Sequence, residues 1–223
     1  MKQIEGIWLP DSDDHFQAHL QANPLYEGRG TYQFKKVEAA LRVVSSDRRG
    51  VAVDVGAHVG LWSRVLAHEF AKVLAIEPVP AHLECLRRNV ADLDNVEILE
   101  AAVTDRNNST VDIILEGGNT GNSRVCDLNQ TMLPGTRTLP CMAIALDALQ
   151  LEAVDLLKVD VEGYEIYVLQ GAETTIKKHK PVVVVEQKQA AYGNDRLAAV
   201  KLLQSWGAEV LWEKAGDVCL GWD

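Results

Sequence analysis

The fold of this chain follows from the stretch Val51-Ala-Val-Asp54-Val-Gly56-Ala57-His58-Val-Gly60. Its first five residues are mostly β-branched and apolar, which is typical of a central parallel strand covered on both faces. The glycines then allow a tight turn and a close approach of the backbone to a ligand. Residues 61–66 continue as a predicted helix. A strand, a glycine turn and a helix in this order predict the crevice where doubly wound α/β folds bind small molecules.

Two acids mark the carboxyl ends of this strand and of the next predicted one. Asp54 stands inside an apolar run, where a carboxylate costs free energy unless it is paired, so we expect a bound cation or a group of backbone amides beside it. The next strand is predicted over Lys72–Ile76 and ends at Glu77-Pro78, 21 residues after Gly56. An acid at this distance commonly binds the two hydroxyls of a ribose. These features predict a ligand that contains adenosine.

The glycine spacing indicates which adenosine ligand this is. A dinucleotide site needs G-x-G-x-x-G beside the pyrophosphate, whereas this chain has Asp-x-Gly-x-x-x-Gly and has no G-x-x-x-x-G-K-[ST] loop. An acid before the first glycine suits the ammonium group of a methionine moiety. S-adenosylmethionine (SAM) is therefore the predicted cofactor. A nicotinamide-dependent oxidoreductase is the disfavoured alternative.

Three blocks of the sequence resemble the FkbM family of class I SAM-dependent methyltransferases. The blocks are 53–60, 75–78 and Leu156-Leu-Lys158-Val-Asp160-Val-Glu162-Gly-Tyr-Glu165, within a likeness that covers about residues 50 to 190. The resemblance implies a Rossmann-like α/β fold: a mostly parallel sheet of seven strands, a C-terminal antiparallel hairpin and helices on both faces. It also implies O-methylation of a hydroxyl on a sugar, glycan or polyketide-like small molecule. His58 departs from the family, which usually has Asn there.

The cofactor-binding candidates come from the end of the first strand and the glycine loop of residues 56–60, which we call the first loop. Others come from the end of the second strand, the end of a third strand predicted over 96–103, and the block of residues 156–165. They are Asp54, Gly56, Ala57, His58, Gly60, Glu77, Pro78, Ala102 and Asp160. We expect His58 to form a hydrogen bond with the methionine end of the cofactor.

Three further acids are the catalytic candidates. Asp160 lies near the end of a strand predicted over 155–161, Glu162 directly follows that strand, and Glu186 ends the neighbouring strand. Side chains at i and i+2 share a face of a strand, and close carboxylates raise one pKa, which would give a base for a hydroxyl acceptor. The same oxygens suit Mg²⁺ or Ca²⁺. Metal-free catalysis is our preferred interpretation because the acids form no recognisable dedicated cage, and Glu162 has the alternative role of capping the next helix.

The rest of the chain is predicted to belong to the same domain, over residues 1–223. Residues 1–50 predict an N-terminal helical extension, and the polar, Gly- and Asn-rich stretch 104–140 predicts an inserted substrate flap. A surface hairpin without a ligand is the alternative for that stretch. His15 and His19 lie one helical turn apart, but without a third ligand they predict surface histidines rather than a metal site.

Composition excludes several classes of partner. The 223 residues carry a formal net charge of −10, which disfavours nucleic acid and anionic membranes. Four scattered cysteines without a C-x-x-C pair predict neither a zinc site nor a disulfide framework. With no apolar leader or spanning stretch, we expect a cytoplasmic protein with a small-molecule or glycan acceptor. A non-catalytic SAM-binding protein is the remaining alternative, and the pattern specifies neither the acceptor nor the oligomeric state.

Overall fold

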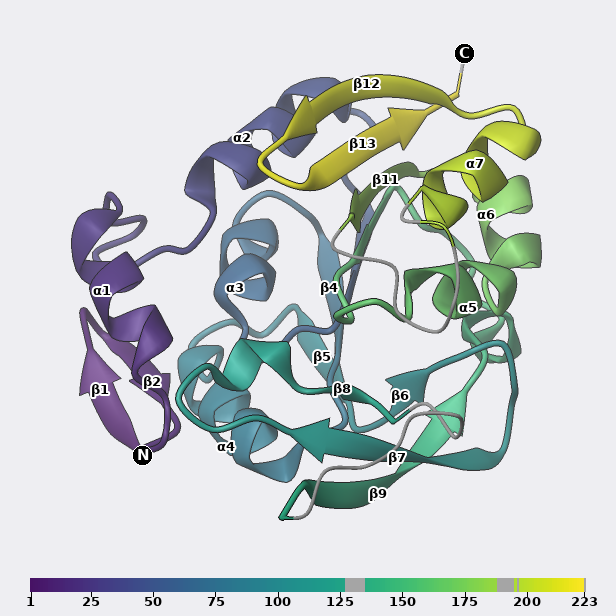
Figure 1. The fold of residues 1–223 in the computed structure, drawn as a ribbon. Coiled ribbons are helices and arrows are strands. Elements are labelled where there is room, and N and C mark those ends of the chain that lie inside the picture. Colours follow the sequence, from purple (N-terminus) through teal and green to yellow (C-terminus); the bar gives the residue numbers. More distant parts are fainter. Residues whose placement is uncertain (127–134, 188–194, 196, 223) are drawn as a thin grey trace.

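The structure, a computed structural model, describes residues 1–126, 135–187, 195 and 197–222. A seven-stranded sheet with the order β12-β13-β11-β10-β3-β4-β5 forms its centre (Figure 1). The strands are β3 (Val51–Val55), β4 (Lys72–Ile76), β5 (Val96–Leu99), β10 (Leu156–Val159), β11 (Val182–Glu186), β12 (Glu209–Lys214) and β13 (Asp217–Gly221). The first five run parallel, and β12 and β13 form an antiparallel hairpin at one edge. The predicted sheet and its closing hairpin are confirmed.

Helices cover both faces of this sheet (Figure 1). One face carries α2 (Phe34–Val43), α3 (Leu61–Ala67) and α4 (Pro80–Asn89), and the other carries α5 (Glu165–Gln170), α6 (Glu173–His179) and α7 (Ala198–Ser205). Because side chains alternate along a strand, Ala52 packs towards α3 while Val53 packs towards α5 to α7. Asp54 shares the α3 side with Ala52.

The N-terminal extension contains more than helices. A hairpin of β1 (Lys2–Ile4) and β2 (Ile7–Leu9) precedes α1 (His15–Ala22). The sequence did not predict this hairpin because three-residue strands are too short to show an alternating pattern. The hairpin is fixed to α4 by the buried Asn89, which accepts a hydrogen bond from the Trp8 amide at 2.7 Å and donates one to the Trp8 carbonyl at 3.0 Å.

The strand predicted over 96–103 is divided between two sheets. Its first part is β5, and its second part is β6 (Ala102–Val103), which joins β7 (Ser109–Leu115), β8 (Arg124–Val125) and β9 (Arg137–Ile144) in a four-stranded sheet of order β6-β9-β7-β8. The predicted flap thus contains regular strands and the short 3₁₀ turn η1 (Thr120–Asn122). Residues 127–134 of the flap lie outside the described residues.

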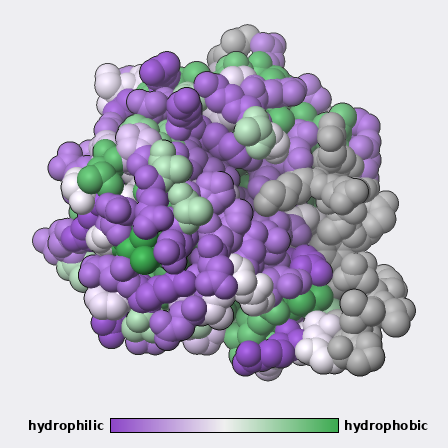
Figure 2. All heavy atoms as spheres, turned by 60° about the vertical axis from the view of Figure 1, so that its left-hand side comes forward, coloured by the Kyte–Doolittle hydropathy of each residue, from purple (hydrophilic) through white to green (hydrophobic). Residues whose placement is uncertain are grey.

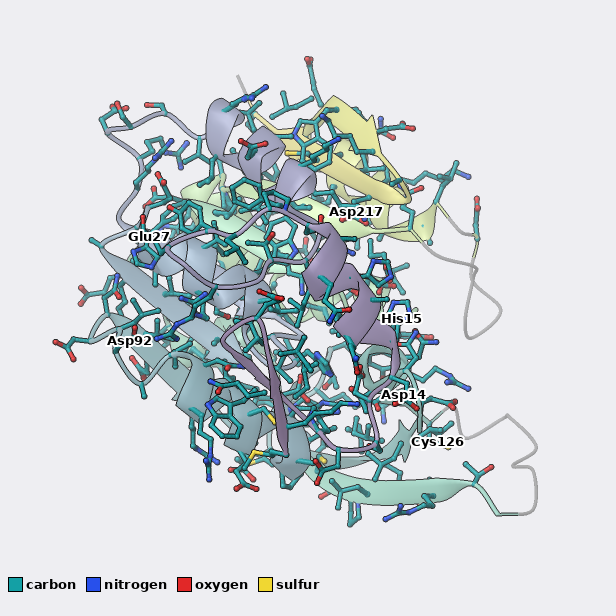
Figure 3. All side chains as sticks on the ribbon, turned by 90° about the vertical axis from the view of Figure 1, so that its left-hand side faces the viewer. Asp14, His15, Glu27, Asp92, Cys126 and Asp217 are labelled. Carbon is teal, nitrogen blue, oxygen red and sulfur yellow. The ribbon has the colours of Figure 1, made fainter. Side chains whose placement is uncertain are left out.

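A buried ion pair fixes α2 to the central sheet. Lys36 Nζ lies 2.7 Å from Asp217 Oδ1, and both side chains are almost fully enclosed. Asp217 begins β13 and is labelled in Figure 3. The pair joins the N-terminal extension to the last strand pair of the chain.

One face of the molecule carries mainly polar groups. Figure 2 shows one face on which hydrophilic residues dominate and hydrophobic atoms form small separate groups. Among the described residues, the helices are all too short or too polar to cross a lipid bilayer.

Lys36→Met is expected to reduce the free energy of unfolding by about 3–5 kcal/mol at pH 7, because it leaves the Asp217 carboxylate buried without its partner. Urea denaturation measures the change. Adding Asp217→Leu to the Lys36→Met variant is expected to restore most of the loss, since an apolar pair replaces a buried charge. A loss below 1 kcal/mol in the single variant would contradict a structural role for the pair.

Candidate active site

A buried ion pair lies at the carboxyl ends of the two central strands. Asp54 on β3 and Lys158 on β10 stand opposite each other in the strand register, with Lys158 Nζ 3.1 Å from Asp54 Oδ1. The other carboxylate oxygen of Asp54 accepts a hydrogen bond of 2.6 Å from Ser63 Oγ on α3. Burial opposes the charge on Lys158, but the Asp54 carboxylate, followed by Asp160, raises the pKa of its ammonium above the usual value. A fixed lysine is therefore the partner of Asp54, where we expected a bound cation or backbone amides.

Lys158 also determines the course of the loop after β3. Its ammonium donates a hydrogen bond of 2.9 Å to the Gly56 carbonyl, and the Gly56 and Ala57 amides both donate to the Ile76 carbonyl at 3.0 Å. Gly56 has φ +76°, and a Cβ there would lie 1.9 Å from the Asp160 carbonyl. Any residue other than glycine would therefore push this loop away from the end of β10.

Two pockets open at this end of the sheet. The first, which we call the β4 pocket, lies between the first loop, the end of β4, β6 and the flap. It has a volume of about 60 Å³. Its main lining residues are Val55, Gly56, His58, Glu77, Pro78, His82, Ala102, Thr120, Gly121, Arg124, Asp160 and Glu162.

Glu77 is the most constrained residue of the β4 pocket. Its Oε1 accepts hydrogen bonds of 3.0 Å from the Val79 amide and from His82 Nδ1, and its Oε2 accepts one of 3.0 Å from the His58 amide. A carboxylate offers about four acceptor positions, so three are used within the protein. Glu77 thus orients the first loop and His82 while it keeps one position for a ligand hydroxyl.

His58 joins the first loop to the flap. Its backbone is left-handed, with φ +51°, and its Nε2 lies 2.8 Å from Thr120 Oγ1. Its ring stacks on Phe16 of α1 at a centroid distance of 4.9 Å. Burial, followed by the positive potential of His82 and Lys158, holds the pKa of His58 well below its usual 6.5, so the ring is neutral at pH 7.

The second pocket, which we call the α1 pocket, is larger, at about 520 Å³. One wall consists of rings from the N-terminal extension and α3: His15, Phe16, His19, Tyr32 and Trp62. His15 projects from the beginning of α1 (Figure 3). The pocket is also lined by the acids Asp160, Glu162 and Glu186 and by Asn119 and Asn122 of the flap. The predicted surface histidines at positions 15 and 19 therefore line a pocket.

The structure brings the three catalytic candidates together. Carboxylate oxygens of Asp160, Glu162 and Glu186 all lie within 4.8 Å of one another, which is close enough for shared metal coordination. Lys158 Nζ lies 3.8 Å from Asp160 Oδ2, so the group already has a cation beside it. Asp160 and Glu162 line both pockets, and Glu186 lines the α1 pocket.

Glu165 binds two backbone amides at this turn. Glu165 Oε1 accepts hydrogen bonds from the Val161 amide at 3.2 Å and the Gly163 amide at 3.0 Å. Glu162 has a left-handed backbone with φ +56°, a conformation that is uncommon for a residue other than glycine. The side chain of Glu165 thus holds the turn in which Glu162 reaches the pockets.

Most of the predicted cofactor residues meet at the pockets. Gly56, Ala57, His58, Glu77, Pro78, Ala102 and Asp160 line one or both. Asp54 is fully buried behind Lys158, and Gly60 begins α3, so the structure does not put these two among the lining residues.

Sequence reasoning missed His82, Thr120, Phe16 and Tyr32. Of these four residues, only His82 lies close in the sequence to its partner, the predicted site residue Glu77 five positions earlier. α1 ends at the stretch Asn23-Pro24-Leu25-Tyr26, where the Asn23 amide donates a hydrogen bond to the His19 carbonyl.

Comparisons with known proteins give one family. A family model described as "Methyltransferase FkbM domain" matches residues 54–210. The "Methyltransferase sdnD" of Sordaria araneosa is 27% identical over 197 residues, which cover 73% of this chain and 75% of that protein. An uncharacterized protein of Methanothermobacter thermautotrophicus is 29% identical over 126 residues, which cover 56% of this chain and 46% of that protein.

Solved structures give the same fold. A methyltransferase FkbM from Methylobacillus flagellatus superposes with a TM-score of 0.51 at 18% identity, over 79% of this chain and 44% of that one. A putative O-methyltransferase from Klebsiella pneumoniae gives 0.51 at 14% identity, over 92% and 87%. This chain therefore spans less than half the length of the archaeal relative and of the Methylobacillus protein.

The pH dependence of stability is expected to depend on Glu165. Burial raises the pKa of this carboxyl from its usual 4.5 to about 7. The folded state then binds the proton more tightly than the unfolded chain, so the contribution to stability is present at acid pH and is lost as the pH rises from about 4.5 to about 7. Denaturation of the wild type and Glu165→Gln across this range measures it. Parallel curves for the two proteins would contradict the assignment.

Proposed function

The chain belongs to the FkbM methyltransferase family, and from this premise we propose that it transfers the methyl group of SAM to a hydroxyl of a small molecule. The proposed acceptors are sugars, glycans and polyketide-like compounds. The observation that carries the proposal is the group of Asp160, Glu162 and Glu186 at the meeting point of the two pockets. One pocket is formed by the residues predicted to hold the cofactor, and the other is lined by residues able to hold an acceptor.

The residues around the β4 pocket fit the adenosine part of SAM. Glu77 keeps an acceptor position for a ribose hydroxyl, and Val79 and Ala102 offer apolar surface for a base. The loop from Gly56 to His58 would hold the methionine end, since Gly56 and His58 line both pockets. When bound, SAM supplies an activated methyl group on a sulfonium centre.

The protein must position the acceptor and remove its proton. Alignment of the reacting atoms supplies much of the rate in such displacements. A hydroxyl must also lose its proton, and we assign the base to the acid group. Asp160 and Glu162 both line the two pockets, and Asp160 is the first candidate because it directly follows the buried strand β10.

The α1 pocket supports a ring-shaped, polar acceptor. Its volume of about 520 Å³ lies within the ordinary range of small-molecule sites. Tyr32 and Trp62 provide flat apolar surface, while Asn119, Asn122 and Glu186 provide hydrogen-bonding groups for hydroxyls. A sugar or a hydroxylated polyketide combines both properties.

We propose catalysis without a metal, although three carboxylates suit a hard cation. The Lys158 ammonium, 3.8 Å from Asp160, would repel a divalent ion bound to that carboxylate. A nicotinamide-dependent oxidoreductase is disfavoured by the missing pyrophosphate loop, and nucleic acid by the net charge of −10.

SAM is expected to raise the melting temperature of the protein, whereas NAD is expected to leave it unchanged. In isothermal titration calorimetry, Glu77→Ala should weaken SAM binding by about 1.5–3 kcal/mol, the contribution of a hydrogen bond to a charged group. Because Glu77 also orients His58 and His82, circular dichroism must first show that the variant is folded. Equal SAM affinity in the wild type and the variant would remove Glu77 from the ligand site.

Asp160→Asn is expected to lower kcat by about 10²–10⁴-fold while SAM affinity is largely retained, because the amide keeps the shape of the side chain but cannot accept the proton. Formation of S-adenosylhomocysteine with a panel of hydroxylated metabolites and glycans measures turnover. A chelator should leave wild-type turnover unchanged. Chelator-sensitive turnover that added Mg²⁺ or Ca²⁺ restores would instead indicate metal catalysis. A protein that binds SAM but methylates no acceptor would be the non-catalytic alternative.

A further inference from the structure

Three parts of the chain that are distant in the sequence are in contact with one another. They are the N-terminal segment before α1, the η1 turn of the flap, and His58 in the first loop. The Gly118 carbonyl accepts hydrogen bonds from the Asp14 amide at 2.8 Å and the His15 amide at 3.0 Å, and the Gly118 amide donates to the Ser12 carbonyl at 2.9 Å. The flap and the N-terminal segment are thus joined through their backbones at the beginning of α1, where Asp14 and His15 are labelled in Figure 3.

Asp13 completes this connection from a fully buried position. Its Oδ1 accepts a hydrogen bond of 2.9 Å from the Phe16 amide and so ties the first turn of α1. Its Oδ2 accepts two hydrogen bonds from Thr120, one of 3.0 Å from the amide and one of 2.6 Å from the hydroxyl. A single carboxylate therefore holds both the helix and the flap.

The remaining hydrogen bond has a defined direction. A hydroxyl has one proton, and the Thr120 hydroxyl donates it to the Asp13 carboxylate, which can only accept. In the 2.8 Å contact with His58, Thr120 Oγ1 must therefore accept, and His58 Nε2 carries the hydrogen. The chain of donors runs from His58 through Thr120 to Asp13, and it forms a polar link between the first loop and the flap.

The β4 pocket is too small for a ligand of ordinary size, so one of its walls must move to admit one. Its volume of about 60 Å³ is well below the 300–1,000 Å³ of ordinary ligand sites. On one side the pocket is bounded by Val55, Ala102 and Val103, which belong to buried strands. On the other side it is bounded by Thr120, Gly121 and Arg124, from the three-residue turn η1 and the two-residue strand β8. The flap wall is attached by the hydrogen bonds of Gly118 and Thr120, so the pocket can open on this side when those bonds break.

We propose that Thr120, held by Asp13, is a positioning residue that closes the flap and the N-terminal segment over the cofactor loop through its hydrogen bond with His58. Breaking this bond opens the β4 pocket for the cofactor and for its product. The inference rests on the proposed function in one respect, the identity of the ligand as SAM.

The same movement affects the acceptor side. Phe16 stacks on His58 and packs against Tyr32 at a centroid distance of 4.7 Å, and both rings line the α1 pocket. Opening of the flap therefore displaces the ring wall of the acceptor pocket together with the cofactor wall. The complete acceptor pocket is formed only when the flap is closed over the cofactor loop.

Thr120→Val tests the proposal, because valine has the shape of threonine without the hydroxyl. In the ligand-free protein, amide hydrogen exchange at His15, Gly118 and Thr120 is expected to become about 10-fold faster. Release of S-adenosylhomocysteine in a stopped-flow displacement experiment is expected to accelerate by a similar factor. A tenfold change corresponds to about 1.4 kcal/mol, within the range of one or two lost hydrogen bonds. Thr120→Ser, which keeps the hydroxyl, is the matched control and should exchange at the wild-type rate.

Other outcomes are also decisive. Asp13→Asn should accelerate exchange at the same amides, and it serves as the second variant if Thr120→Val does not fold. Wild-type exchange rates in the folded variants, or equally fast exchange in Thr120→Ser and Thr120→Val, would overturn the proposal. If S-adenosylhomocysteine does not bind the wild type, the proposed function fails, while the exchange measurement still tests the closure.

Discussion

The buried pair of Asp54 and Lys158 is the constraint on which the rest of the site depends. It connects β3 and β10 at their carboxyl ends, with both charged groups almost completely removed from water. Such a pair contributes little net stability, but removing one partner leaves an uncompensated buried charge. The pair determines the geometry of the site, because the Lys158 ammonium also binds the Gly56 carbonyl and lies next to Asp160. One side chain thereby fixes the first loop relative to the acid group.

The parallel sheet explains why the acids meet. Parallel strands present their carboxyl ends at one edge, so Glu77 after β4, Asp160 after β10 and Glu186 at the end of β11 lie at the same edge although they are far apart in sequence. At this edge, Glu77 orients His58 and His82 through hydrogen bonds, and Glu165 holds the turn that carries Glu162. The turn that carries Glu162 is thus supported by a neighbouring side chain with a defined hydrogen-bonding task.

The N-terminal extension and the flap complete the pockets around this edge. Lys36 fixes α2 to β13 through an ion pair, and Trp62 of α3 donates a hydrogen bond of 3.1 Å to Gln33 just before α2. The flap then joins α1 through Gly118 and Asp13. The β4 pocket and the α1 pocket therefore have walls built from segments that precede and interrupt the central fold.

The sequence by itself determined the central sheet, the closing hairpin, the glycine loop and the acids at the strand ends, because buried parallel strands and tight turns impose local residue patterns. It did not determine the β1–β2 hairpin, the division of residues 96–103 between two sheets, or the ring wall from α1, since those depend on contacts between distant segments. Only the tertiary structure assigned Lys158 as the partner of Asp54 and joined Asp13, Thr120 and His58. Hydrogen bonds between residues 62 and 107 positions apart leave no periodic signal in a sequence, because they are decided by packing rather than by local propensity.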